Sequence, residues 1–337
     1  MRRDPIGVVE AAYRIRGTDD DWLRGVRDAA APELDAGFGV AACFFELWRG
    51  NGWGNGRLLA DGCHRALEAG FQRSMTDPYW ERHSVALLES GTFTCGTMTQ
   101  YLRRHFLALR TTREDLLPNG IRDMLSVVGV NPSGVSCGLT AGLPRPIRMG
   151  KRATARWSRI AAHMAAGLRL RTSLATSRDV FAGAEAILDP DGACVHAERP
   201  AAAKQTMAGL RRSVRAVDRA RGRLRRSDPD EALTIWLGLC AGRWSLLDYV
   251  DKDGRRFVLA RRNDPAVAPL DSLTLAERQT VAYASLGHTN KLIAYELGVS
   301  ETAISMRLSS AARKLGVRSR VELLRRYRER ILSATPR

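Results

Sequence analysis

The amino-acid sequence predicts a multidomain protein in which an α/β region is followed by a small all-α domain of four helices. The chain has 337 residues, which at roughly 150 residues per domain suggests two or three domains. Segments typical of strands and helices alternate over most of its length, whereas four short helices with clear start and stop signals occupy the C-terminal end. We therefore expect a first region 1–173, a second region 178–262, a linker 263–269 and a C-terminal domain 270–337.

The first region begins with two predicted helices, over residues 5–16 and 19–34. Thr18 precedes the second helix as an N-cap, and three aspartates follow it where the positive end of a helix favours acids. Residues 38–48 are rich in β-branched and aromatic side chains, which predicts a buried strand. The glycine- and asparagine-rich residues 50–56 predict a hairpin turn into a second strand near Leu58.

The rest of the first region predicts one more strand and several helices. The strand, residues 135–143, is bounded by Asn-Pro-Ser-Gly and Pro-Arg-Pro turn sequences. The clearest helix covers residues 152–171, because its apolar residues recur on one face: Trp157, Ile160, Ala161, Met164 and Leu168. Further helices are expected over parts of 63–76, 78–90 and 97–109, and another over 113–128.

The second region contains two predicted hairpins, over residues 184–197 and 244–260. Asp-Pro-Asp-Gly and Asp-Lys-Asp-Gly sequences form their turns. A basic helix over 204–226 and a helix over 230–241 separate them, so the two hairpins are expected to join in one small sheet. The linker 263–269 contains two prolines and is expected to be semi-rigid.

The basic helix 204–226 also carries an apolar stripe at heptad positions, which predicts a dimerising helix. Arg221 interrupts the stripe at one core position. Two alternatives remain open: its arginines are simply solvated, or they contact DNA. The stripe consists of Met207, Leu210, Val214, Val217 and Leu224.

The charge of the chain is strongly basic and unevenly distributed. The 53 Lys and Arg residues exceed the 36 Asp and Glu residues, for a formal net charge of +17. Residues 204–226 hold nine basic residues and one acid, and residues 268–337 hold twelve and six. This concentration predicts a polyanionic partner near the C-terminus, which by charge alone could be DNA, RNA or an acidic membrane.

Other features exclude several classes of protein. No apolar run approaches the roughly 18 residues of a membrane span, so the chain is not expected to cross a membrane. Glu10 and Arg14 interrupt the position where a signal peptide needs apolar residues. The six cysteines lie far apart without a C-x-x-C pair, which predicts reduced thiols and no zinc site. We therefore expect a cytoplasmic protein without a metal or other cofactor.

The C-terminal domain has the most informative pattern. Thr274 and Glu277 form a capping box that opens a helix ending at Gly287. Thr289 can cap a second helix over 290–297, and Gly298 follows its last apolar residue. Ser300 can cap a third helix over 301–315, and the box Ser319–Glu322 opens a fourth. A glycine between the second and third short helices is typical of a helix-turn-helix, here at about 290–309.

The segment LTLAERQTVAYASLGHTNKLIAYELGVSETAISMRLSSAARKLGVRSRVEL resembles the DNA-binding domain of LuxR/FixJ-type transcriptional regulators over its full length. The matches are Leu273, Thr274, Glu277, Val281, Gly287, Asn290, Lys291, Ile293, Ala294, Leu297, Val299, Ser300, Leu308, Lys314, Leu315, Gly316, Val317, Ser319 and Arg320. The resemblance implies a non-enzymatic transcription regulator that binds double-stranded DNA as a homodimer and works with RNA polymerase.

The third helix would then lie in the major groove while the second crosses the backbone. Ile304, Leu308 and Ala311 are spaced to face the core. The expected DNA-binding residues are Thr289, Asn290, Lys291, Ser300, Glu301, Thr302, Ser305, Met306, Arg307, Arg313 and Lys314. The family usually has Thr, Val, Lys, a polar residue and often His where this chain has Ala303, Ile304, Ser305, Met306 and Arg307, so two customary DNA contacts are missing.

The regions before this domain resemble known families only weakly. The order of elements in 1–173 is similar to that of GAF domains, and AEAILDPDGACVHAE resembles the opening strands of PAS domains. These resemblances imply a sensory region with an unidentified input, such as a small-molecule effector. Two alternatives remain. RLSSAARKL, beginning at Arg307, resembles region 4 of sigma factors, and Ser136 in Gly-Val-Ser-Cys-Gly would suit an enzyme with a DNA anchor.

Three weaker patterns favour ordinary structural roles. No helix is expected after Ser136, so a strand residue is favoured over a nucleophile. Cys63 and His64 form the only adjacent Cys/His pair, which is insufficient for a metal site. An aromatic group could line a ligand pocket, although core packing is favoured: Tyr79, Trp80, His83, Phe93 and Tyr101.

Overall fold

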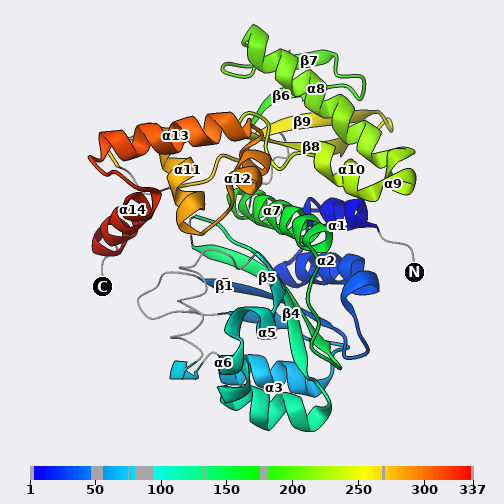
Figure 1. Ribbon diagram of the computed structural model, residues 1–337. Helices are drawn as coiled ribbons and strands as arrows, with labels where there is room; N and C mark the ends of the chain where they lie inside the picture. The colour runs from blue at the N-terminus through cyan, green and yellow to red at the C-terminus, as the bar shows by residue number, and fades with distance from the viewer. Residues whose placement is uncertain are drawn as a thin grey trace.

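The computed structural model describes residues 4–46, 56–74, 76–79, 94–132, 134–174, 181, 183–267 and 270–334. These residues form two antiparallel sheets with flanking helices, followed by a C-terminal group of helices (Figure 1). The coarse prediction of an α/β part followed by an all-α part is therefore confirmed. The predicted turn 50–56 and the predicted helix 78–90 lie largely outside the described residues.

The first sheet has the strand order β2-β1-β5-β4-β3, and each pairing is antiparallel. The long strand β5 lies at its centre, where Gly138 pairs with Cys43 on one side and with Val128 on the other. The strands are β1 Val40–Glu46, β2 Arg57–Leu59, β3 Cys95–Thr97, β4 Asp123–Gly129 and β5 Val135–Leu143.

Helices cover both faces of this sheet (Figure 1). Leu125 and Val127 of β4 belong to the apolar cluster that contains Ile160 and Met164 of the long helix α7. Val128, which alternates with them, belongs to a second cluster on the opposite face. The first face carries α1 Pro5–Ala12, α2 Asp19–Leu34 and α7 Lys151–Leu174; the second carries α3 Arg65–Ser74, α5 Met98–Leu102, α6 Arg104–Ala108, the π-helix η1 Thr112–Leu116 and the 3₁₀ helix η2 Leu117–Asn119.

The second sheet confirms that the two predicted hairpins join. Strand β6 pairs with β7 and also with β9, which gives the order β7-β6-β9-β8. Its strands are β6 Ala184–Leu188, β7 Cys194–Ala197, β8 Trp244–Val250 and β9 Arg256–Arg262, and its helices are α8 Lys204–Arg221, α9 Leu224–Ser227 and α10 Pro229–Ile235.

The expected helix over residues 113–128 is wrong. Gly120 adopts a positive φ of 78° and ends η2, after which the chain enters β4. The turn-forming Pro118 and Asn119 were the signal for this break, and β-branched Val127 and Val128 favour a strand. Strand β4 is stabilised by pairing along its length with β5. The spacing of apolar residues within one segment cannot predict this pairing.

The predicted dimerising stripe on the basic helix is also wrong, because that stripe is buried inside the chain. Met207, Leu210, Val214 and Val217 are at most 8% exposed and belong to the same apolar cluster as Ile160 and Met164 of α7. The helix also breaks at Gly222, between α8 and α9. The apolar face of α8 therefore stabilises its own subunit and is not free to pair with another.

The C-terminal helices follow the predicted pattern closely. Thr274 and Glu277 form the capping box of α11, and Ser300 caps α13. Gly298 ends α12 in the left-handed conformation, with φ 62°. Because Gly has no Cβ, it adopts this conformation without strain. The four helices are α11 Leu275–Ser285, α12 Asn290–Leu297, α13 Glu301–Lys314 and α14 Arg320–Ala334.

Candidate nucleic-acid interface

Helix α13 has one buried and one exposed face, as the sequence predicts. Ile304 and Ala311 are fully buried, and Leu308 is 8% exposed. On the opposite face Met306 is 68% exposed, a high value for a large apolar side chain. The other exposed residues of this face are Glu301, Thr302, Ser305, Ser309 and Arg313. A rigid helix with a polar face and one protruding methionine has the form of a helix that reads a groove.

The caps of α12 and α13 fix the direction of both helices. The Thr289 hydroxyl accepts a hydrogen bond from Leu292 N at 3.2 Å. The Ser300 hydroxyl accepts one from Ala303 N at 3.1 Å. Each cap satisfies one of the free amide groups of its helix and leaves others available to a phosphate.

Asn290 joins three helices on this surface. Its Nδ2 donates to Ser305 Oγ at 3.2 Å, and its Oδ1 accepts from Arg320 Nη1 at 2.6 Å. Arg320 also donates to the His288 carbonyl. Arg320 was not predicted as a site residue, although it lies among the residues that resemble the LuxR/FixJ-type pattern. Its predicted position at the start of the fourth helix could have indicated that it belongs to the site.

The predicted basic residues differ in their surroundings. Lys291 and Arg313 are exposed. Arg307 is half-buried, burial lowers its pKa, and it makes no hydrogen bond to any residue that the structure describes. Lys314 instead donates to Glu277 Oε2 at 2.8 Å. Three of the four cations are thus free to meet DNA, whereas the Lys314 ammonium is used inside the domain.

The pair of Lys314 and Glu277 makes the domain sensitive to acid. Burial alone would raise the pKa of Glu277, but hydrogen bonds from Lys314, the Thr274 backbone and nearby hydroxyls lower it from 4.5 to about 2. A lowered pKa stabilises the fold above the unfolded value, and this contribution is lost as the pH falls from about 4.5 toward 2. Replacing Lys314 by methionine should therefore destabilise the protein by about 1–2 kcal/mol at pH 7 and much less near pH 2.

Chemical denaturation at several pH values measures this difference. Arg313→Met is the matched control, because Arg313 is adjacent, equally cationic and without a partner among the described residues. Equal losses of stability for the two variants at pH 7 would contradict the prediction.

The other candidates are placed as ordinary structural residues. Ser136 is fully buried in β5, and its hydroxyl donates to the Gly134 carbonyl, so no nucleophile is exposed. All six cysteines are free, and the described residues contain no group of three His, Cys, Asp or Glu side chains that could hold a metal. Tyr79 bonds to His105, and Tyr101 donates to the Cys95 carbonyl. The other aromatic residues of that group, Trp80, His83 and Phe93, lie outside the described residues.

The helix-turn-helix is held against the rest of the chain through a buried contact that sequence reasoning missed. The Tyr295 hydroxyl of α12 lies 2.7 Å from His163 Nε2 on α7, 2.6 Å from the Trp236 carbonyl and 2.7 Å from the Leu233 carbonyl. The opposite ring nitrogen of His163, Nδ1, bonds to the Tyr13 hydroxyl at 3.1 Å. We call these five residues the docking seam.

Two further contacts reinforce the docking seam. Arg169 of α7 donates both to Asn131, just beyond β4, and to the Tyr283 hydroxyl of α11. The segment before α11 is also anchored, because Asn263 donates to the Ala166 carbonyl and to Ser245 Oγ. The expected semi-rigid linker is therefore packed at its start against both sheet-containing regions.

Comparison with known families assigns the C-terminal domain. The family model described as "Bacterial regulatory proteins, luxR family" matches residues 271–327, about a sixth of the chain. No curated protein matches the chain. No helix among the described residues is long and apolar enough to cross a membrane. Residues 271–327 therefore form a luxR-family domain, which supports a role for the chain as a DNA-binding transcription regulator.

Proposed function

We propose that the protein is a sequence-specific transcription regulator that inserts α13 into the major groove of double-stranded DNA and catalyses no reaction. The observation that carries this proposal is the exposed face of α13 over a fully buried core, in a domain of the luxR family. Helix α12 crosses the DNA backbone in this arrangement. The strong positive charge of the C-terminal end supports binding to a polyanion.

The DNA-binding residues divide into two groups in this proposal. Thr302, Ser305, Met306 and Arg307 contact bases, with the Met306 side chain suited to a thymine methyl group and Arg307 to guanine. Most of the others position the domain on the phosphate backbone. These are Thr289, Asn290, Lys291, Ser300 and Arg313, with Arg320 added because it holds Asn290. The anionic Glu301 begins α13 at its groove end, and the Lys314 ammonium pairs with Glu277 instead.

The N-terminal regions control the DNA-binding domain in this proposal. The docking seam supports this, because it buries a hydroxyl of α12 among groups from α1, α7 and the end of α10. The loop around Leu239 also packs against Gly298, at the N-terminal side of α13 that must approach DNA bases. Docking thus restrains the domain at the N-terminal side of α13, which has to approach the DNA bases. Release of the domain from the N-terminal regions therefore favours DNA binding.

Partners follow from the same mechanism. A homodimer presents two copies of α13 to half-sites about one helical turn apart, and its contacts with RNA polymerase convert binding into regulation. The dimer does not use the apolar face of α8, which is buried.

Two substitutions test the proposed contacts in the full chain. Arg307→Ala should weaken binding to the cognate site by about 1–3 kcal/mol and flatten the preference at one base pair. Lys291→Ala should weaken binding to cognate and random DNA alike, because it removes one phosphate contact. It should also lower the slope of log affinity against log salt by about one.

The measurement is fluorescence anisotropy with cognate and scrambled duplexes between about 50 and 200 mM salt, a range in which phosphate contacts weaken steeply. Genome-wide DNA capture with purified protein supplies the cognate site. Arg325→Ala is the control, since Arg325 is exposed on α14 and pairs with Glu329. Failure of the full chain to bind any duplex at low salt would refute the proposed function.

A further inference from the structure

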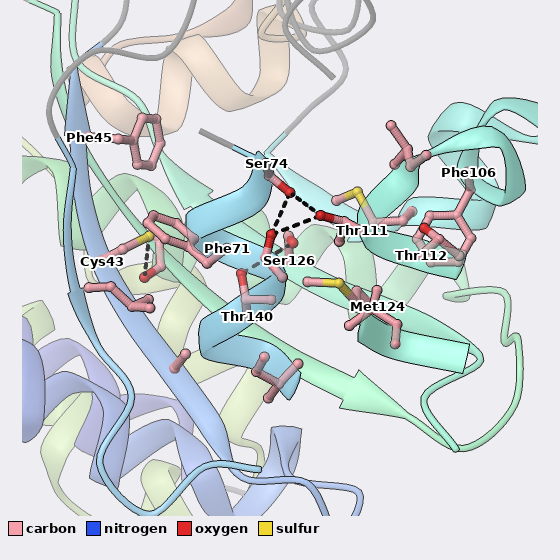
Figure 2. Close-up of a pocket in the computed structure, with 18 of the residues that line it drawn as sticks. Cys43, Phe45, Phe71, Ser74, Phe106, Thr111, Thr112, Met124, Ser126 and Thr140 are labelled. Atoms are coloured by element: carbon pink, nitrogen blue, oxygen red, sulfur yellow. Dashed lines mark hydrogen bonds between the residues drawn. The ribbon is translucent and has the colours of Figure 1, made fainter. Parts of the chain in front are cut away.

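A cavity lies on the face of the first sheet that is remote from α7 (Figure 2). Strands β1, β4 and β5 form one wall, and α3, α6 and the π-helix η1 form the other. The centre of a water molecule can move through about 70 Å³ of it. One water needs roughly 10–15 Å³ on this measure, so the cavity holds a molecule of several heavy atoms. Closely packed protein interiors contain few voids larger than a water, so this space is unusual.

The walls of the cavity are apolar and uncharged. Phenylalanines from three elements line it, Phe45 on β1, Phe71 on α3 and Phe106 on α6, together with Met98 and Leu116. No Asp, Glu, Lys, Arg or His of the described residues lines it. Transferring an ion into such surroundings costs several kcal/mol without a partner of opposite charge. The cavity therefore excludes anions and cations and suits an uncharged molecule.

A few hydroxyl groups give the cavity a polar side. Ser74 and Thr111 can both donate to the Gly70 carbonyl, at 2.8 and 3.1 Å, and their oxygens lie 3.4 Å apart, so each oxygen can still accept a hydrogen bond. Figure 2 shows these two side chains next to each other in the cavity wall. Thr112 also lines the cavity, is fully buried, and its hydroxyl has no hydrogen-bond partner among the described residues. An unpaired buried hydroxyl is costly, and a ligand would relieve that cost.

The backbone beside these hydroxyls is unusual as well. Thr112 begins the π-helix η1, and Thr111 precedes it. Single turns of π-helix are rare and are found frequently at functional sites. The turn places the two consecutive threonines in the wall of the cavity. The unsatisfied hydroxyl and the π-helix are separate observations on the same wall.

We propose that this cavity binds a small, uncharged, mainly apolar molecule that carries one hydroxyl or amide group. The apolar part contacts the phenylalanines, and the polar group meets the hydroxyls of Ser74, Thr111 and Thr112. This inference goes beyond DNA binding and does not depend on it, because the site is complete within the first region.

Three fluorinated probes with the same ring test the proposal in the full-length protein by ¹⁹F NMR. 4-Fluorobenzyl alcohol is uncharged with a hydroxyl, 4-fluorotoluene lacks the hydroxyl, and 4-fluorobenzoate is an anion. We expect saturable one-to-one binding of the alcohol, binding of the toluene at least about threefold weaker, and no saturable binding of the benzoate. Equal binding of the benzoate, or no saturable binding of the alcohol, would overturn the proposal.

Two variants assign the binding to this cavity. Ser126→Leu fills space from β4 and should weaken binding of the alcohol at least tenfold. Thr112→Val preserves shape and should remove the advantage of the alcohol over the toluene. Thr172→Val is the matched control, because Thr172 is an exposed threonine on α7. If Ser126→Leu fails to fold, Thr112→Val still decides. An unchanged ratio of alcohol to toluene affinity in Thr112→Val would place the binding elsewhere and overturn the assignment.

Discussion

Replacing Gly298 by alanine is expected to release the helix-turn-helix domain and to tighten DNA binding by roughly tenfold or more, since affinity scales with the population of the binding-competent state. A Cβ at this position would lie 1.8 Å from the Leu239 carbonyl oxygen and 2.9 Å from its carbon. Both are backbone atoms of the neighbouring region and cannot move aside as a flexible side chain can. The docked arrangement therefore cannot accommodate alanine.

Gly316→Ala is the matched control for this prediction. Gly316 has φ 65°, close to the 62° of Gly298, but a Cβ there would meet nothing within 4 Å. Both substitutions therefore impose a similar backbone strain of about 1 kcal/mol, whereas only Gly298→Ala adds the clash. Any difference between them reports on docking.

Two measurements follow release of the domain. Small-angle scattering should give a larger radius of gyration for Gly298→Ala than for Gly316→Ala, and proteolysis near Asn263 should be faster. DNA affinity should rise only in Gly298→Ala. A released domain with unchanged or weaker DNA affinity would contradict control by docking while leaving the proposed DNA contacts intact.

The cavity and the docking seam are linked through one strand and one helix. On β4, Ser126 and Val128 line the cavity, whereas Leu125 and Val127 pack with α7 on the opposite face. A Cβ on Gly129 would lie 2.6 Å from the Ala161 carbonyl oxygen, so β4 and α7 are in close contact. Because α7 carries the histidine of the docking seam, a molecule that shifts β4 has a direct mechanical route to the DNA-binding domain.

Features that depend on local sequence were predictable. The caps at Thr274 and Ser300 use hydrogen bonds that span three residues, and Gly298 ends a helix for a reason intrinsic to glycine. The buried face of α13 follows from 3.6 periodicity at Ile304 and Leu308. This local character explains why the C-terminal domain and most of its candidate site follow from the sequence.

Features that depend on distant partners were not predictable. From the sequence alone, Tyr295 is an ordinary apolar residue of an amphipathic helix. Its role becomes evident only from its contact with His163, which lies 132 positions away in the sequence. Strand β4 requires β5 beside it, so its sequence alone did not exclude a helix. The stripe on α8 has the spacing of a dimer interface, and only the burial of Val214 in an apolar cluster shared with other elements shows that it is internal. The cavity likewise needs residues from separate segments.

Lowering the pH is expected to reduce the stability of the docked structure, because His163 is buried in it. The pKa of this side chain falls from 6.5 to about 3, because burial and the cation of Arg159 lower it more than its hydrogen bond to the Trp236 carbonyl raises it. The groups around it offer no carboxylate to pair with a protonated ring: they are Tyr13, Trp236, Tyr295 and Arg159. His163 is therefore neutral in the docked state at neutral pH.

The direction of the pH effect follows from this lowered pKa. Above pH 6.5 the His163 ring is neutral in every state, so it does not change the free energy of unfolding. Below pH 6.5 the unfolded or opened chain binds a proton that the docked chain does not bind. Stability is thus lost as the pH falls from 6.5 toward 3. For one group with these two pKa values, the loss between pH 7 and pH 5 is about 2 kcal/mol.

Urea unfolding and proteolysis near Asn263, each at pH 7 and pH 5, measure this loss. The wild type should lose about 2 kcal/mol more than His163→Gln over this interval, because glutamine does not titrate. His196→Gln is the control, since the His196 side chain is 56% exposed beside Glu198; it should retain the full pH dependence. If His163→Gln kept the same pH dependence as the wild type, the acid sensitivity would arise elsewhere. If that variant lost the dependence, the acid sensitivity would arise from protonation of His163 at the buried contact between α7 and α12.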